Sequence, residues 1–182
     1  MGISLIALVF FDTIYTLLTK NKMDSTTREE FIKAKRHLDT EVIRRNFRKS
    51  TERYKLLEEL YKFHDHFMAE EFYLHLIQNN FQVSMATVYN NLVFFEEVGL
   101  VLKHQFGKGQ AARYERALGR KQHCHLICIR CNQIFEFCDP RIHHIQTTVE
   151  EHFGATVTGH SLTLYGECNR EECRNSYPAI EL

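Results

Sequence analysis

The residues best suited to chemistry lie between His123 and Cys131, where two histidines and three cysteines share nine positions. Cys128 and Cys131 form a C-x-x-C pair, and after 36 intervening residues Cys168 and Cys173 form a second pair. Thiolates are preferred ligands of tetrahedral Zn²⁺, and four of them leave no coordination position for water. The two pairs therefore predict a structural zinc site, with unrelated reduced cysteines as the alternative.

The six cysteines all follow His123 in the chain. In a secreted, disulfide-bonded protein the bridges would normally span the chain, whereas clustered C-x-x-C pairs are typical of metal sites in cytosolic proteins. We therefore expect reduced, metal-binding cysteines and a cytoplasmic location.

A second kind of metal site is indicated by the H-x-H of His123 and His125. Alternate residues of a strand face the same side, so the two imidazoles should point together and Cys124 should point away. If carboxylates join them, such a nitrogen and oxygen site suits Fe²⁺, Mn²⁺, Zn²⁺ or Co²⁺. The alternative is that the histidines are structural. Candidates for the remaining ligands are Glu115, Glu136 and His66.

Four segments with apolar residues at helical spacing precede these sites and are predicted as helices. Ser84 is a suitable N-cap for the last helix, and Gly99 is a suitable residue to end it. A short helix, a tight turn and a helix with a small, uncharged polar face are the layout of a helix-turn-helix. The helices are predicted over residues 27–46, 50–62, 69–79 and 84–99. The polar face of the last one carries Ala86, Thr87, Tyr89 and Asn90.

Two strand-like runs, residues 100–106 and 112–116, follow the helices and are joined by a turn at residues 107–110. We interpret this hairpin as a wing whose basic residues are placed to meet phosphates. The alternative is a generic three-helix core with a surface hairpin. The basic residues of the wing are Lys103, Lys108, Arg113 and Arg116.

The last third of the chain has the pattern of a small α+β domain. Strands are predicted over residues 124–129, 134–138 and 156–166, and a helix is predicted to start at Pro140 and reach about Phe153. A domain of about 60 residues has a small core, so a structural metal would stabilise it.

Charge is balanced over the 182 residues, with 23 basic and 23 acidic side chains, but it is unevenly distributed. Residues 33–62 hold ten Lys and Arg against five Asp and Glu, whereas residues 134–182 hold three against eight. A basic front half suits a polyanionic partner, and two solvated helix faces are the alternative. The apolar fraction of 44% is ordinary for a globular protein.

The first 26 residues form an extension of different character. The apolar run at residues 3–18 is interrupted by Asp12 and is shorter than the roughly 20 residues of a membrane span. It also lacks the basic start and cleavage site of a signal peptide. We therefore expect no membrane association. The run either forms a helix that packs on a neighbour or precedes a true translation start at Met23.

Together these motifs resemble the Fur (ferric uptake regulator) family of bacterial metal-responsive transcription regulators. The resemblance covers about residues 46–175, and its motifs are jointly very specific. The matching segments are Val83–Leu92, Glu97–Val101, Arg113–Glu115, His123–Cys131, Glu136–Phe137 and Thr158–Cys168.

The resemblance implies an α+β protein with an N-terminal winged helix-turn-helix domain and a small α/β dimerisation domain. We place these domains at residues 27–117 and 118–182, after the extension at residues 1–26. The implied function is metal-dependent DNA binding by a homodimer on a palindromic, double-stranded operator. The regulator would act as a repressor of iron or metal homeostasis genes.

Matching position by position, the resemblance also assigns the site residues. The structural Zn²⁺ falls on Cys128, Cys131, Cys168 and Cys173, although the Cys168–Cys173 spacing is wider than the commoner C-x-x-C. The ligands of the sensing metal are assigned to His66, Glu115, His123, His125 and Glu136. The DNA contacts are assigned to Lys49, Arg53, Thr87, Tyr89, Asn90 and Lys108. Fe²⁺ is the expected sensing ion, with Mn²⁺ or Zn²⁺ as alternatives.

Three departures from the family pattern affect these expectations. Asn90 stands where many iron-sensing members have arginine, so the operator sequence that the chain recognises is expected to differ. Gln122 and Cys124 stand at ligand positions of a third metal site of some members, so that site is not expected in its usual form. Glu115 and Glu136 stand where peroxide sensors typically have aspartate, which favours a metal sensor.

Two other functions of the same fold stay open as alternatives. A peroxide sensor would use an iron-loaded sensing site, and a haem-responsive regulator would use a thiolate such as Cys124 or Cys138 together with histidine. We do not expect an enzyme, because the four-thiolate site is closed and no pair of nucleophile and base stands out.

Overall fold

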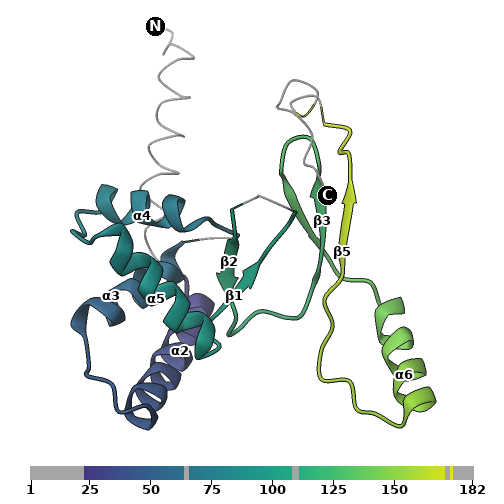
Figure 1. The fold of residues 1–182 in the computed structure, drawn as a ribbon, viewed down its shortest axis with the longest axis horizontal. Helices are drawn as coiled ribbons and strands as arrows, with labels where there is room; N and C mark the ends of the chain where they lie inside the picture. Colours follow the sequence, from purple (N-terminus) through teal and green to yellow (C-terminus); the bar gives the residue numbers. More distant parts are fainter. Residues whose placement is uncertain (1–22, 64–65, 108–110, 171–172, 174–182) are drawn as a thin grey trace, which may run out of the picture. The chain divides into compact units, whose positions relative to one another are not determined.

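The computed structural model describes residues 23–63, 66–107, 111–170 and 173 (Figure 1). They form two compact units. The first consists of the described residues up to Lys103 together with Arg113–Gly119, and the second of the described residues among His104–Ala112 and from Arg120 onward. The apolar run at residues 3–18 and Lys108 lie outside the described residues, so the predictions about them stay predictions.

The first unit contains helices α2 (Ser25–Arg44), α3 (Thr51–Lys62), α4 (Ala69–Gln78) and α5 (Met85–Glu97). Serine and aspartate side chains accept hydrogen bonds from the first turns of three of them. Asp24 caps α2, Ser50 caps α3 and Ser84 caps α5, as the sequence predicted for the last. The buried faces meet in a core of Leu38, Leu56, Leu57, Leu60, Leu76, Leu92 and Phe95.

Helix α5 is followed by the small sheet of the wing. The helix ends at Glu97, and Gly99 takes the left-handed conformation (φ +71°) that lets the chain reverse. Strands β1 (Val101–His104) and β2 (Arg113–Arg116) then form a two-stranded sheet. The predicted first strand, residues 100–106, is too long: the strand ends at His104 because Phe106 turns into the core of the second unit.

The second unit is built on a three-stranded sheet of order β4-β3-β5. The central β3 (Cys124–Cys128) pairs antiparallel with β4 (Ile134–Phe137) and parallel with β5 (Thr163–Gly166). The parallel pair requires a long crossover, which contains helix α6 (Arg141–Phe153).

Two sequence predictions for this unit differ from the structure in length. The predicted strand over residues 156–166 is wrong in its first half, because pairing with β3 begins only at Thr163. Residues 155–162 belong to the crossover and form no regular element. The predicted helix starts at Arg141 with Pro140 as its N-cap, and it ends at Phe153 as expected.

The apolar residues of the second unit are divided between a small core and its surface. Phe106 (7% exposed) and Ile127 pack together with Ile129 and Ile134. Helix α6 buries no residue, and Phe153 at its end is 72% exposed. Among the helices described, none has the length and apolar character needed to cross a bilayer. The architecture confirms the predicted class, a winged helix-turn-helix followed by a small α/β domain.

Candidate metal centres and nucleic-acid interface

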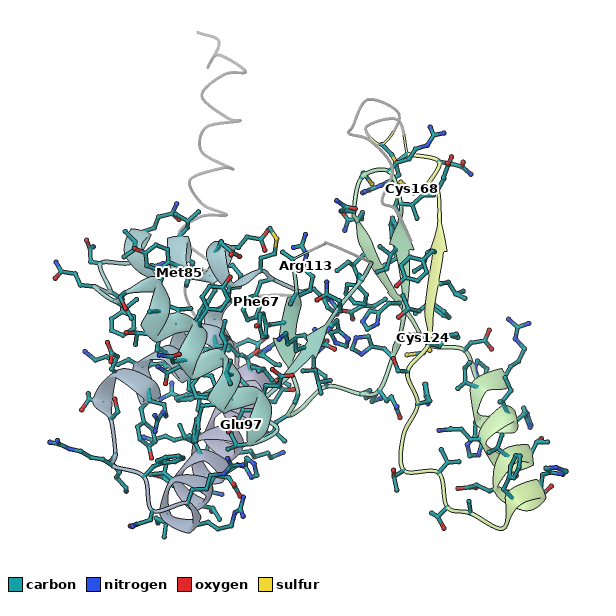
Figure 2. The ribbon with its side chains drawn as sticks, in the orientation of Figure 1. Phe67, Met85, Glu97, Arg113, Cys124 and Cys168 are labelled. Atoms are coloured by element: carbon teal, nitrogen blue, oxygen red, sulfur yellow. The ribbon has the colours of Figure 1, made fainter. Side chains whose placement is uncertain are left out.

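The four cysteines of the two pairs meet at one end of the three-stranded sheet. Cys128 ends β3, and the parallel register places Gly166 beside it, two residues before Cys168 (Figure 2). The Sγ atoms of Cys128, Cys131, Cys168 and Cys173 all lie within 4.8 Å of one another. The sulfurs of Cys128 and Cys173 are 3.4 Å apart, and those of Cys131 and Cys168 are 3.7 Å apart.

These distances fit a tetrahedral zinc site. With Zn–S bonds of about 2.3 Å, the sulfurs of a tetrahedral site lie about 3.8 Å apart. The cysteine at the wider spacing, Cys173, joins the group although its position could not be derived from a C-x-x-C pattern. These two S–S distances are too long for a covalent bond, so the arrangement contains no disulfide among the four cysteines and agrees with a metal site.

The surroundings favour the thiolate at Cys128 and Cys168, whereas the hydrogen bond with Cys168 is the main cause that raises the pKa of Cys173. Burial raises the pKa of Cys128, but backbone N–H groups of Cys168, Cys131 and Arg130 outweigh it and lower that pKa to about 6. The N–H of Cys168 lies 3.3 Å from the Cys128 sulfur. The Cys173 hydrogen bond is the main cause that lowers the pKa of Cys168. The protein itself therefore stabilises the thiolate form of Cys128 and Cys168, without a bound cation.

The first unit contributes one histidine and one glutamate as candidate ligands of the sensing metal ion. The backbones of Phe67 and Tyr114 pair with each other, which brings the preceding His66 and the following Glu115 together. Nε2 of His66 lies 3.5 Å from a carboxylate oxygen of Glu115, and the two side chains are 4% and 1% exposed. A buried imidazole beside a buried carboxylate fits half of a nitrogen and oxygen metal site.

The second unit contributes the H-x-H and a glutamate. The rings of His123 and His125 lie 4.8 Å apart, so they point to the same side as the strand pattern predicted. Glu136 on β4 stands opposite His125, and its Oε1 lies 3.8 Å from Nε2 of His123. The Nδ1–H of His123 donates to the carbonyl of Lys121 at 2.9 Å, and this tautomer leaves the Nε2 lone pair available to a metal ion.

Arg120 is a further residue of this group that sequence reasoning missed. Its Nη2 lies 2.6 Å from both carboxylate oxygens of Glu136. No local pattern links residues 120 and 136, because the contact depends on the pairing of β3 with β4.

The exposed face of α5 carries the residues predicted to read DNA. Tyr89 and Asn90 are exposed, and Thr87 is half-buried with its hydroxyl 2.8 Å from that of Ser84. The Tyr89 hydroxyl donates to Glu70 of α4 at 2.5 Å. This hydrogen bond is the main cause that raises the pKa of Tyr89, to about 12. Glu70 is a second residue that the sequence did not single out.

Arg53 and Lys49, predicted as backbone contacts, have different surroundings. The Arg53 guanidinium lies 4.3 Å from the centre of the Phe94 ring, and its Nε donates to Asn91 at 3.1 Å. Both partners are on α5, so Arg53 supports that helix from beneath. Lys49 is largely exposed, with its Nζ 3.6 Å from a carboxylate oxygen of Asp39.

Cys124 lies apart from the cluster of four cysteines, at the opposite end of the sheet (Figure 2). It is buried, and its Sγ lies 3.7 Å from Nε2 of His160. Burial is the main cause that raises the pKa of this thiol, with Cys138 and Asp139 adding to it. The amide of Gln122 donates to the His160 carbonyl at 2.5 Å.

Comparison with known proteins agrees with these features. A model of the ferric uptake regulator family matches residues 44–165. The ferric uptake regulation protein of Escherichia coli K12 is 36% identical over 130 residues, which are 71% of this chain and 86% of that protein.

Two solved structures resemble the fold. The Helicobacter pylori ferric uptake regulator, described as having three functional metal-binding sites, has a TM-score of 0.68 and 26% identity, covering 81% of this chain and 96% of that one. The Pseudomonas aeruginosa ferric uptake regulator with manganese has a TM-score of 0.63 and 28% identity, covering 72% and 98%. With its winged helix-turn-helix, four-cysteine cluster and matching relatives, the chain belongs to the ferric uptake regulator family.

Proposed function

We propose that the chain is a metal-dependent transcription regulator, which binds a palindromic operator as a homodimer when its sensing site is loaded. Repression of iron or metal homeostasis genes is the expected outcome. Zn²⁺ is the structural ion, and Fe²⁺ is the expected sensing ion, with Mn²⁺ or Zn²⁺ as alternatives. The observation that carries the proposal is that candidate sensing ligands are supplied by both units: a buried imidazole–carboxylate pair in one, and an H-x-H with a glutamate in the other.

The proposed sensing mechanism follows from that division of ligands. His66 and Glu115 belong to the winged-helix unit, whereas His123, His125 and Glu136 belong to the second unit. If all five residues bind one ion, metal binding favours the arrangement of the two units in which all five can reach that ion. The ion shifts the population only by its preference for that arrangement. Typical coupling energies correspond to factors of about 5–150 in affinity.

The proposed DNA interface uses the exposed face of α5 and basic residues near it. Tyr89 and Asn90 are available to base edges, because they are exposed on a helix suited to the major groove. Lys49 is exposed and suited to a phosphate. Arg53 supports α5 in the structure, so we expect it to act mainly by positioning that helix. The remaining proposed contacts are Thr87 and Lys108.

The proposed homodimer is supported by the apolar surface of the second unit. Ile145, Val149 and Phe153 recur at four-residue intervals along α6 and are all exposed. Leu164 and Tyr165 of β5 add two further exposed apolar side chains. Apolar surface of this extent in a small unit is typical of an oligomer interface.

The sensing site is tested by the double substitution His123→Ala, His125→Ala. We expect normal zinc content and a normal dimer, because both histidines lie outside the four-cysteine cluster. Metal-stimulated operator binding should be lost, a decrease of at least about fivefold in the stimulation ratio. The measurement is an anaerobic fluorescence-anisotropy titration with Fe²⁺, Mn²⁺ and Zn²⁺.

The matched control removes two exposed histidines of α6, His144→Ala and His152→Ala. This variant should respond to metal as the unchanged protein does. Unchanged metal dependence in the His123, His125 variant would refute the sensing site. Irreversible loss of DNA binding when the iron-loaded protein meets peroxide would favour the peroxide-sensing alternative, and a Soret band that disappears with Cys124→Ala or Cys138→Ala would favour haem.

A further inference from the structure

The Glu136 carboxylate lies between a guanidinium and an imidazole. Arg120 Nη2 is 2.6 Å from each of its oxygens, and His123 Nε2 is 3.8 Å from Oε1. Glu136 and His125 are directly opposite in the β3–β4 register, so their side chains share one face of the sheet. The side chains of Arg120 and Glu136 are 22% and 32% exposed, so water screens this ion pair only in part.

A cation that binds Glu136 has to compete with this contact. The guanidinium occupies lone-pair positions on both oxygens, and a metal ion needs at least one of them. If Arg120 moves away, the charge-assisted hydrogen bonds are lost. If Arg120 stays, a positive charge remains close to the metal ion and repels it. Either outcome weakens metal binding relative to a site that lacks the arginine.

We propose that Arg120 sets the affinity and selectivity of the sensing site by competing with the metal ion for Glu136. This inference rests on the proposed function, because it takes Glu136 as a sensing ligand. Arg120 acts here as a built-in competitor that raises the metal concentration needed to load the site.

The competition affects ions unequally. Tetrahedral Zn²⁺ can be satisfied by four ligands, and the set has four without Glu136. These four are His66, Glu115, His123 and His125. Ions that prefer six ligands, with more oxygen among them, depend on the fifth protein ligand and therefore on release of Glu136. Arg120 thus weakens Mn²⁺ and Fe²⁺ binding more than Zn²⁺ binding.

The test is a set of binding isotherms on the full-length, zinc-containing dimer. Affinities for Mn²⁺ and Zn²⁺ are measured by competition with a chromophoric chelator, without DNA, for the unchanged protein and for Arg120→Gln. We expect Mn²⁺ to bind about fivefold more tightly to the variant, and Zn²⁺ to gain less than about twofold. Operator binding should then reach its midpoint at a correspondingly lower Mn²⁺ concentration.

Four further variants separate this effect from a structural one. Arg120→Lys keeps the charge, and its Mn²⁺ affinity should remain close to that of the unchanged protein. Arg120→Met should bind Mn²⁺ more tightly, as Arg120→Gln does. Arg141→Gln removes a guanidinium of the same unit that is paired with another carboxylate, Asp139, and should change neither affinity. In a Glu136→Gln background, Arg120→Gln should increase the Mn²⁺ affinity by clearly less, because no carboxylate remains to be released and only the charge repulsion is relieved.

A damaged fold would weaken metal binding, so an increase in metal affinity cannot be explained by misfolding. Equal or weaker Mn²⁺ binding by both neutral Arg120 variants, with zinc content and dimer intact, would overturn the inference. A gain in Mn²⁺ affinity that is undiminished in the Glu136→Gln background would overturn it as well. Failure of the proposed function gives a different result, in which the unchanged protein itself binds no ion beyond the structural zinc.

Discussion

At the scale of single residues, hydrogen bonds decide which atoms are available for chemistry. The Lys121 carbonyl selects the tautomer of His123, and Arg120 holds the oxygens of Glu136. Backbone N–H groups prepare Cys128 to carry a negative charge. None of these partner groups is itself a proposed metal-binding atom, yet each affects how strongly a neighbouring ligand atom can bind a cation.

Cys173 provides a prediction at this scale. Cys173→Ser should reduce the zinc content from about one ion per chain to well below one, and it should destabilise the second unit, because one of four thiolates is lost. Zinc is measured by elemental analysis, and stability by thermal unfolding. Cys138→Ser is the matched control, since Cys138 is exposed and lies outside the cluster. Equal zinc content in the two variants would remove Cys173 from the site.

At the scale of elements, ion pairs and caps keep the helices of the winged unit in place. Glu59 of α3 lies 3.3 Å from Nε2 of His75 on α4 and 2.7 Å from Nζ of Lys62. The His75 hydrogen bond is the main cause that lowers the pKa of Glu59, opposed by burial and assisted by Lys62. The pair therefore connects the first helix of the helix-turn-helix with the helix before it.

A pH-dependent loss of stability follows from that contact. Because the folded-state pKa of Glu59 lies below its ordinary value of 4.5, its stabilisation is present above pH 4.5 and is lost as pH falls through the folded-state value. Glu59→Gln should lower the free energy of unfolding by about 0.5–1 kcal/mol at pH 7 and by less at pH 3. Urea unfolding at the two pH values measures this.

The neighbouring Glu58 supplies the control for that experiment. It lies 3.2 Å from the same Lys62, but its side chain is about half exposed. Glu58→Gln should therefore change stability less than Glu59→Gln at pH 7. A loss for Glu59→Gln that is the same at both pH values would contradict an electrostatic origin.

Local signals predicted some elements well and others poorly. Ser84 and Gly99 marked the ends of α5, because a cap and a left-handed glycine are set by neighbouring residues. The strand predicted over residues 156–166 was too long, because alternation does not reveal where the partner strand begins. Phe106 was assigned to the wing for the same reason: its place in another core depends on residues far along the chain.

The candidate site shows the same division between local and distant information. Spacing alone brought Cys128 and Cys131 together, and strand alternation predicted that His123 and His125 share a side. The contacts of Arg120 and Glu70 were not predicted, because they join residues 16 and 19 positions apart whose pairing exists only after folding.

At the scale of the whole molecule, we expect the exposed apolar stripe on α6 to determine assembly. The double substitution Ile145→Asp, Phe153→Asp should shift the protein from dimer to monomer at micromolar concentration, because burying two carboxylates is unfavourable. Analytical ultracentrifugation measures the change. The control is Asn132→Asp, which adds a carboxylate at a left-handed position that Asn and Asp both tolerate. A stable dimer in the double variant would place the interface elsewhere.

The route of the chain through its two units limits how the protein can be divided. The chain passes from the first unit to the second after Lys103, returns at Arg113, and leaves again after Gly119. A fragment that starts at Arg120 keeps the cysteines, the sheet and α6, but it lacks Phe106 and therefore part of its hydrophobic core. The second unit is thus discontinuous in sequence, and no single cut of the chain yields both units complete.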